Sequence, residues 1–374
     1  MTRKLKILHI LPNLSRGGAE KVCQDLLLNL NQEKFSLSLL LFNENGSGED
    51  IKKELISRGI EIFSLKKTHL IDLANFSKII KTIKNLNPDI LHCHLGGDIY
   101  GRFAGKFCKV PIIISTEHNI NRNEKPSAAY LKKLSAHFAT KIFAVSEAVK
   151  DDANKRYGIP PEKIEVISNG IDLRVFTGKK NDILSPNESK KIIIGGLGRL
   201  TEQKGFNVLI EAVSKTNSQD YLVQIAGSGE LEKKLNNKIN ELNLKKRIEL
   251  IGQVDTIDFL PKIDIFVFPS LWEGLGLAIL EAAAMKIPII ASDINSLKEI
   301  INNDSAWLFK VGSARELANK IDHVIKNINS EEISAKTNKA REIIMNKFDL
   351  KTMISKYEYW YELLFEKYEN SSSK

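Results

Sequence analysis

Two carboxylates stand eight positions apart in an otherwise apolar stretch of the chain, PSLWEGLGLAILEAAAM at 269–285. The stretch follows an apolar strand candidate, and a helix is expected to start near Gly276. Glu273 then lies on the loop and Glu281 in the second turn of the helix, so the acids are not a pair on one helix face. Carboxylates accept hydrogen bonds from sugar hydroxyls, and amides at a helix N-terminus suit a phosphate. The stretch predicts a site for an extended sugar–phosphate–ribose ligand.

The glycines between the two acids shape this stretch. Gly274 and Gly276 interrupt the loop, and the amides of Gly276 and Leu277 would open the helix toward a ligand. A plainer role for Glu281 is an acid that the helix dipole stabilises by about 0.3–1 kcal/mol. That role explains why an acid stands near the start of the helix. It does not explain why the acid stands beside the apolar run Ala282–Met285.

A second loop carries two cations between glycines, in the run GGLGRLTEQKG at 195–205. It directly follows an apolar strand candidate, and Arg199 and Lys204 come after Gly198. An arginine fork together with a lysine point charge suits a diphosphate. The alternative is a pair of solvated surface cations. The position at the carboxyl end of a strand favours a ligand-binding role.

A third glycine loop follows the first strand candidate, in the run LSRGGAE at 14–20. Gly17 and Gly18 let the backbone approach a ligand, and the helix that begins near Ala19 would offer amides to a phosphate. The loop has the spacing of neither a dinucleotide fingerprint nor a P-loop. A tight strand-to-helix turn is therefore the alternative.

Three histidines lie in two short polar runs, DILHCH at 89–94 and STEHN at 115–119. His92 and His94 are two apart on a strand candidate, so they share one face. A zinc site would need further ligands, and none is convincing in the sequence, so a hydrogen-bonded structural role is favoured for His92. His118 follows a strand on a polar loop, where a substrate-facing role and a structural role are both open.

Short apolar runs alternate with amphipathic helical patterns along the chain. This rhythm predicts parallel sheets covered on both faces by helices. The strand candidates of the first half are LKILHILP, FSLSLLLF, IEIFSL, DILHCHL, PIIIST and KIFAVS, with helices such as 19–30 and 71–85 between them. Those of the second half are KIIIGGLG, YLVQIAGSG, RIELIG, IDIFVFPS and IPIIASD. Ligands bind at the carboxyl ends of strands in open parallel sheets, which is where the glycine loops lie.

A length of 374 residues predicts two domains. The rhythm pauses at 173–190, where Gly, Pro, Asn, Ser and charged residues indicate a linker. Two Rossmann-like α/β domains are expected, at 1–172 and 191–349, with a ligand cleft between them. The pattern KTMISKYEYWYELLFEKY at 351–368 predicts a helix whose aromatic face must be buried. The final NSSSK is expected to fray.

The composition limits the class of protein. Hydrophobic residues make up 43% and charged residues 27% of the chain, as in ordinary globular proteins. The formal charge of +9 favours phosphorylated ligands or an anionic membrane surface, although a lysine-rich proteome explains it equally well. No basic run is dense enough for nucleic-acid binding. The three cysteines lack the spacing of a disulfide framework, which fits the cytoplasm, and no run reaches the roughly 18 apolar residues of a membrane span.

The order of these motifs resembles the retaining glycosyltransferases of family 4. The order is GGAE, EHN, AVSE, NGID, GRL…QKG, GSGE, PSLWEGLGLAILEAAA and PIIASD, and it covers nearly the whole chain. Each motif alone is weak evidence, whereas the ordered set is specific, above all the spacing of Glu273 and Glu281. The resemblance implies the GT-B fold, in which two doubly wound Rossmann-like domains face each other across a cleft. It also implies a C-terminal helix, here 350–370, that crosses back to the N-terminal domain.

The resemblance implies roles for individual residues. Arg199 and Lys204 would hold the donor diphosphate, Glu273 would contact sugar hydroxyls and Glu281 the nucleotide ribose. His118 would contact the transferred sugar, which makes the expected catalytic set His118, Arg199, Lys204 and Glu273. The other expected ligand contacts are Gly17, Gly18, Gly198, Gly227, Val254, Gly274, Gly276 and Leu277. No bound metal is needed in such enzymes, and the lack of an Asp-x-Asp element agrees.

A nucleotide-sugar is the expected donor, with a UDP-sugar favoured over GDP-mannose and no separate cofactor. The cations would stabilise charge on the departing diphosphate, in a transition state that resembles an oxocarbenium ion. The family resemblance suggests same-face attack with retention, in which the departing phosphate oxygen takes the acceptor's proton, so Glu273 is not assigned as a nucleophile. The GGAE start resembles bacterial enzymes of polysaccharide and lipid-linked oligosaccharide synthesis, which predicts a glycan or polyprenyl-diphosphate acceptor.

Six cations of the first domain suggest peripheral docking on an anionic leaflet, with general solubility as the alternative. They are Arg102, Lys106, Lys109, Arg122, Lys132 and Lys133. Rival functions are another GT-B enzyme, such as a UDP-sugar epimerase or a soluble glycoside synthase, and a non-enzymatic sugar-nucleotide-binding protein. A decayed site would be expected to lose Arg199, Lys204 or Glu281, yet all three are present. A Rossmann oxidoreductase is disfavoured because both glycine loops lack the third glycine.

Overall fold

The protein folds as two compact units in the computed structural model, which describes residues 3–15, 17–43, 48–65, 73–122, 124–177 and 191–372. Unit 1 comprises Met1–Asn169 together with Leu350–Lys374, and unit 2 comprises Gly170–Asp349. The linker predicted at 173–190 lies outside the described residues from position 178 onward.

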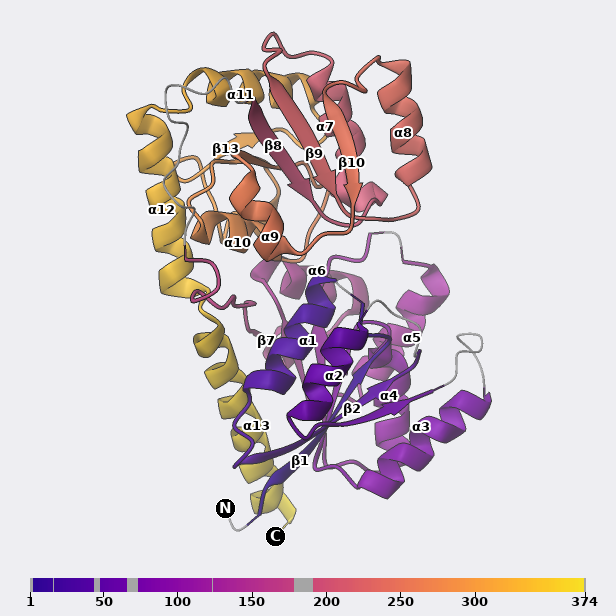
Figure 1. The fold of residues 1–374 in the computed structure, drawn as a ribbon. Helices are drawn as coiled ribbons and strands as arrows, with labels where there is room; N and C mark the ends of the chain where they lie inside the picture. Colours follow the sequence, from indigo (N-terminus) through magenta and orange to yellow (C-terminus); the bar gives the residue numbers. More distant parts are fainter. Residues whose placement is uncertain are drawn as a thin grey trace. The chain divides into compact units, whose positions relative to one another are not determined.

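Unit 1 is built on a seven-stranded sheet in which every strand pair is parallel (Figure 1). The strands, in spatial order, are β3 (Glu61–Ser64), β2 (Phe35–Leu41), β1 (Leu5–Leu11), β4 (Ile90–His94), β5 (Ile112–Glu117), β6 (Lys141–Ala144) and β7 (Ile164–Val166). The chain moves outward from β1 to β3 and then returns to β4 on the other side of β1. The topological switch point of unit 1 therefore lies between β1 and β4, where ligands bind in such sheets.

Helices connect these strands, as parallel neighbours require. They are α1 (Gly18–Asn29), α2 (Glu49–Ser57), α3 (Leu73–Leu86), α4 (Gly97–Phe107), α5 (Pro126–Ala136) and α6 (Glu147–Tyr157). The boundaries of α6 are well marked in the sequence, because the Ser146 hydroxyl accepts from the Val149 amide at its start and Gly158 ends it at φ 63°.

Unit 2 is built on a six-stranded parallel sheet. Its strands, in spatial order, are β10 (Ile248–Gly252), β9 (Tyr221–Ala226), β8 (Ile192–Leu197), β11 (Ile265–Phe268), β12 (Ile289–Ser292) and β13 (Trp307–Phe309). Its helices are α7 (Phe206–Val213), α8 (Glu232–Glu241), α9 (Thr256–Phe259), α10 (Leu277–Ala284), α11 (Ala314–Lys326) and α12 (Glu331–Lys347). The strand order reverses between β8 and β11, which places the switch point of unit 2 at that pair.

The C-terminal helix α13 (Leu350–Ser372) belongs to unit 1, as the motif resemblance predicted (Figure 1). Tyr357 and Tyr361 are fully buried one helical turn apart. The Tyr361 hydroxyl lies 2.6 Å from His92 Nδ1, and the Tyr357 ring packs edge-on against Phe143 at 5.2 Å between ring centres. The final NSSSK at 370–374 was expected to fray, but the helix continues through Ser372, and positions 373–374 lie outside the described residues.

The predicted fold class is confirmed: both halves are doubly wound parallel α/β units. Every strand candidate of the sequence forms a strand. The sequence patterns missed β7 and β13, which have three residues each and are too short to show a period. Among the described helices, none combines the length and apolar character needed to cross a bilayer.

Candidate active site

The carboxyl edge of the unit 2 sheet brings two predicted loops together at the switch point. The loops after β8 and β11 leave neighbouring strands at the same edge. Their backbones interlock, because the Leu271 amide donates to the Gln203 carbonyl over 2.8 Å. Gly205, at φ 61°, passes so close to the Pro269 carbonyl oxygen that a side chain there would collide with it. The two loops form one continuous surface.

Lys204 and Glu273 form an ion pair on this surface, with 2.6 Å between Nζ and Oε1. Glu273 is 5% exposed. Its Oε1 also accepts from the Ser270 hydroxyl over 2.8 Å, and its Oε2 accepts from the Gln203 amide over 3.3 Å. The Lys204 ammonium lies 5.0 Å from the centre of the Phe268 ring. The buried Glu273 carboxylate, which accepts several hydrogen bonds, therefore holds the Lys204 ammonium at the end of β11. The spacing of the two residues in the sequence could not show this ion pair.

The loops after β8 and β9 also touch through glycine. Gly198 and Gly227 have φ values of 153° and 141°, and a side chain on Gly227 would overlap the Gly198 carbonyl oxygen. The Leu200 amide donates to the Ser228 carbonyl over 2.9 Å. Arg199, between these contacts, is exposed and makes no ion pair with any described residue. The loop thus presents an arginine at the switch point with a backbone that is fixed on both sides.

Helix α10 begins at Leu277, with Gly276 in the left-handed region at φ 92° and no side-chain cap in the described structure. Its first amides are therefore available to an anionic ligand. Glu281 lies in the second turn and is half-buried, and Gly274 is buried in the loop before the helix. Val254 is half-buried in the loop after β10. The predicted start of the helix and the placement of Glu281 are confirmed.

In unit 1, the loop after β1 leads into α1 with Gly17 as the N-cap residue and Gly18 exposed. The Glu20 carboxylate folds back over Gly17, where it accepts from the Ser15 hydroxyl over 2.7 Å. A side chain on Gly17 would collide with that carboxylate. Because the Glu20 carboxylate is the flexible end of a side chain and can move, this contact does not by itself require glycine, and the phosphate-binding role and the turn role of Gly17 both stay open.

Four histidines gather at the carboxyl ends of β1, β4 and β5. His9 is the register partner of His92. His9 Nδ1 lies 3.1 Å from His94 Nε2, and His94 Nδ1 lies 3.1 Å from His118 Nε2. Burial, together with the nearby Lys132 ammonium, lowers the pKa of His118 to about 3, so the ring is neutral near pH 7. His9 was missed from the sequence, where its one signal is a histidine inside the apolar run LKILHILP.

His92 has the structural role that the sequence favoured. Its Nδ1 lies 2.6 Å from the Tyr361 hydroxyl, and its Nε2 lies 2.8 Å from Thr116 Oγ1. The nitrogens of His9, His92 and His94 lie within 4.8 Å of one another, close enough to raise the question of a metal site. Both nitrogens of His92 are already hydrogen-bonded, and His9 and His94 bond to each other. These contacts engage five of the six ring nitrogens and leave only His9 Nε2 of this group without a partner among the described residues, so the group is mainly a hydrogen-bond cluster.

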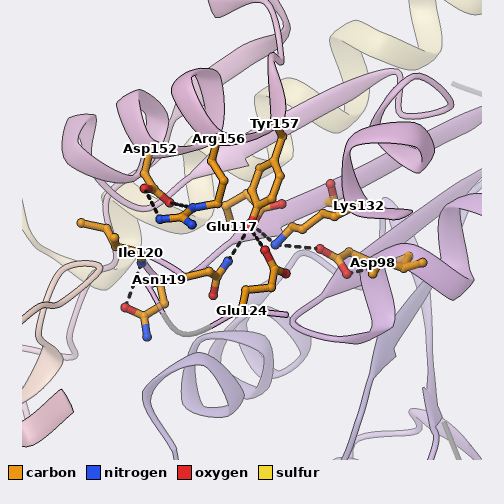
Figure 2. Close-up of polar contacts among 12 residues, drawn as sticks. Asp98, Glu117, Asn119, Ile120, Glu124, Lys132, Asp152, Arg156 and Tyr157 are labelled. Carbon is orange, nitrogen blue, oxygen red and sulfur yellow. Dashed lines mark hydrogen bonds and ion pairs between the residues drawn. The ribbon is translucent and has the colours of Figure 1, made fainter. Parts of the chain in front are cut away.

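A buried cluster of two acids and two cations lies beside His118, and Figure 2 shows three of its members, Asp98, Glu117 and Lys132. Lys132 Nζ lies 2.5 Å from Glu117 Oε2 and 3.2 Å from Asp98 Oδ2. Arg102 reaches Glu117 Oε1 over 3.1 Å. Burial alone would lower the pKa of Lys132, but the two carboxylates raise it above its usual value, so the amine stays charged. The cluster is neutral as a whole, which is what allows four charges to be buried together.

Tyr157 joins this cluster to the loop after β5, as Figure 2 shows. The Lys132 ammonium lies 5.0 Å from the centre of the Tyr157 ring. The Tyr157 hydroxyl donates to Glu124 Oε2 over 2.6 Å and accepts from the Asn121 amide over 3.1 Å. The cluster therefore anchors the loop that carries His118.

Two of the six cations predicted to face a membrane are buried, so that part of the prediction is wrong. Arg102 is 0% and Lys132 is 6% exposed, because Asp98 and Glu117 neutralise them inside unit 1. The sequence could not distinguish them from surface cations, since their partners come from other elements. The remaining four are exposed: Lys106, Lys109, Arg122 and Lys133.

Family models match both halves of the chain. The model described as Glycosyltransferase Family 4 matches residues 16–175, and the model described as Glycosyl transferases group 1 matches residues 179–341. The chain belongs to the group 1, family 4 glycosyltransferases. The family predicted from the order of the motifs is confirmed.

The relatives named here cover more than nine-tenths of this glycosyltransferase. The UDP-Gal:alpha-D-GlcNAc-diphosphoundecaprenol alpha-1,3-galactosyltransferase of Escherichia coli is 27% identical and covers 94% of this chain and 95% of its own. The capsular polysaccharide biosynthesis glycosyltransferase CapH of Staphylococcus aureus is 26% identical and covers 92% of this chain and 99% of its own. The crystal structure of Anabaena Alr3699/HepE in complex with UDP and glucose matches with a TM-score of 0.84 at 20% identity, over 96% of this chain and 99% of that one. The glycosyltransferase therefore has the GT-B fold.

Proposed function

We propose that this glycosyltransferase moves a hexose or N-acetylhexosamine from a UDP-sugar to a lipid-linked or glycan acceptor during synthesis of a bacterial cell-surface polysaccharide. The observation that carries the proposal is the Lys204–Glu273 pair at the unit 2 switch point, beside the open N-terminus of α10. A relative named for UDP-Gal and a diphosphoundecaprenol acceptor, and another named for capsular polysaccharide biosynthesis, support this choice. GDP-mannose is the second candidate donor.

The residues of the switch point suit the departure of a nucleoside diphosphate. Lys204, Arg199 and the first amides of α10 would stabilise the charge that develops on the diphosphate, and we propose that no metal ion is needed there. Glu273, held by Lys204, would accept from hydroxyls of the sugar. Glu281, one turn into α10, would accept from the ribose. Gly198, Gly227, Gly274 and Val254 would let the backbone approach the nucleotide.

Retention of the anomeric configuration is part of the proposal. Glu273 is engaged by Lys204, Ser270 and Gln203, which suits a carboxylate that orients hydroxyls rather than one that attacks carbon. We therefore propose same-face attack, in which the departing phosphate oxygen takes the proton of the acceptor hydroxyl. The acceptor would be held by unit 1, where Gly17, Gly18 and His118 lie at the carboxyl edge of the sheet.

Substitution of Glu281 by alanine should weaken UDP binding by about 10- to 100-fold, the loss expected for hydrogen bonds to a charged acceptor. Isothermal titration calorimetry with UDP, GDP and ADP measures this directly, and the unmodified enzyme should bind UDP most tightly. Glu241→Ala, at an exposed site on α8, is the matched control and should leave the affinity unchanged. An unchanged affinity of Glu281→Ala for UDP would remove the ribose assignment. The relative rates with different UDP-sugars should change little.

We further propose that the enzyme acts in the cytoplasm and docks peripherally on the anionic leaflet through α5. Tyr130, Leu131 and Leu134 of α5 are 66%, 41% and 43% exposed, which is unusual for large apolar side chains on one helix. Exposed Lys133 lies among them, and the chain carries a formal charge of +9. Apolar side chains bordered by cations suit the interface of an anionic membrane.

Replacement of Tyr130, Leu131 and Leu134 together by serine should abolish sedimentation with anionic vesicles. Each exposed cation near such a surface contributes about 1 kcal/mol, so the unmodified protein should bind anionic vesicles and release them at high salt. Ile257→Ser, which removes an exposed apolar side chain from unit 2, is the control. Equal sedimentation with neutral and anionic vesicles would contradict the docking surface.

A further inference from the structure

His9, His94 and His118 form a continuous chain of hydrogen bonds in unit 1. His9 Nδ1 and His94 Nε2 lie 3.1 Å apart, and so do His94 Nδ1 and His118 Nε2. The two outer nitrogens, His9 Nε2 and His118 Nδ1, are buried and have no hydrogen-bond partner within the described part of the chain. This row of hydrogen bonds runs from His9 on the central strand β1 to His118, the predicted sugar contact, on the loop after β5.

The number of ring protons limits the directions in which the three histidines can donate hydrogen bonds to one another. Burial lowers the pKa of His9 and of His118 to about 3, and lowers that of His94 well below its usual value. Each ring is therefore neutral near pH 7 and carries one N–H. The two internal hydrogen bonds use two of the three N–H groups. The third must lie at an outer nitrogen, so one end of the chain is a donor and the other end is a bare acceptor.

The surroundings of the two ends favour one order. A buried N–H without an acceptor is rarer, and so more costly, than a buried acceptor without a donor. His9 is 0% exposed on β1, at the inner end of the chain. His118 is half-buried on a loop at the carboxyl edge, where ligands bind in such sheets. The unmet N–H is better tolerated at His118, because a bound substrate can supply the acceptor.

We propose that His9 donates to His94 and His94 donates to His118, so that His118 presents its Nδ1–H to a hydroxyl oxygen of the transferred sugar. His94 and His9 are then positioning residues, which fix the tautomer and the ring plane of His118 without touching the substrate. The sugar as the acceptor rests on the proposed function. The order of the three histidines does not, because it follows from the ligand-free protein alone.

The tautomers of the three rings test the proposal directly. Long-range ¹H–¹⁵N correlation spectra of the full-length protein, with ¹⁵N-labelled histidine and no ligand, distinguish protonated from bare ring nitrogens. Single substitutions by glutamine assign the signals, and exposed His137 provides an internal reference. The proposal predicts Nδ1–H on His9, His94 and His118, the minor tautomer of free imidazole. Nε2–H on His94 and His118, or a charged ring in either, would overturn it. Neither result depends on catalytic activity, so failure here is distinct from failure of the proposed function.

Substitution of His94 provides a second test. His94→Phe removes both hydrogen bonds, and we expect kcat for sugar transfer to fall about 10-fold, equivalent to one hydrogen bond, with UDP affinity unchanged. His94→Gln can both donate and accept and should recover part of the loss, whereas His137→Gln should behave as the unmodified enzyme. Loss of UDP affinity in parallel with kcat, or no difference between phenylalanine and glutamine, would count against a positioning role. If His94→Phe does not fold, the tautomer spectra decide.

Discussion

Replacement of Lys204 by methionine should reduce kcat for sugar transfer by about 10²- to 10³-fold, the usual cost of removing one group that stabilises developing charge. In the structure, the Lys204 ammonium lies 2.6 Å from Glu273 Oε1 at the end of β11. In the proposed reaction the same ammonium balances the charge on the departing diphosphate. Steady-state rates of UDP release with a saturating UDP-sugar measure the effect. Lys233→Met, at an exposed site on α8, is the control and should keep the full rate.

A fall in kcat for Lys204→Met would have a second explanation, because Lys204 could serve only to neutralise the buried Glu273 carboxylate. The double variant Lys204→Met with Glu273→Gln separates the two, because it removes both charges at once. If neutralisation is the only role, the double variant should regain UDP affinity and thermal stability to the level of Glu273→Gln alone. If Lys204 binds the diphosphate, UDP affinity should stay low although stability recovers. A single Lys204→Met variant with unchanged turnover would contradict the assignment altogether.

Replacement of Lys132 by methionine should destabilise unit 1 by about 3–5 kcal/mol, the cost of breaking a buried ionic network by removing one partner. The substitution leaves Asp98 and Glu117 with Arg102 as their one remaining cation in the cluster. Amide hydrogen exchange of β4 and β5 in increasing urea reports the stability of unit 1 separately from that of unit 2.

Lys133→Met is the matched control, since it changes the next residue of α5, which is exposed. Its effect should stay within about 0.5 kcal/mol. Addition of Glu117→Gln to Lys132→Met removes the excess negative charge and should restore part of the stability. Equal stability of the Lys132 and Lys133 variants would show that the buried cluster contributes nothing to folding.

The sequence predicted the elements of this fold well because parallel strands buried on both faces are short apolar runs, and such runs stand out between helical patterns. It also predicted the start of α10 and the second-turn position of Glu281, because glycine marks the boundary of that helix. The motif order identified the family, which periodicity alone could not do. The assignments of Arg199, Lys204, Glu273 and Glu281 to parts of a ligand remain predictions.

The contacts within each site could not be predicted, because they join residues from different loops and strands. The pairing of Lys204 with Glu273 spans 69 positions, and the His9–His94 contact spans 85. Arg102 and Lys132 look like surface cations in sequence, yet acids from β5 and α4 bury them. Residue type and spacing therefore identified the candidate loops, and tertiary pairing decides what their side chains can do.

Sugar transfer from a uridine nucleotide is tested by incubation of the unmodified enzyme with single UDP-sugars and a polyprenyl-diphosphate-linked sugar acceptor. Mass spectrometry and NMR of the products give the stoichiometry and the new linkage. We expect one UDP-sugar to yield UDP and glycosylated acceptor in equal amounts, with the anomeric configuration of the donor retained. Conversion of the donor to another UDP-sugar without acceptor, or transfer from GDP-mannose and from no UDP-sugar, would contradict it.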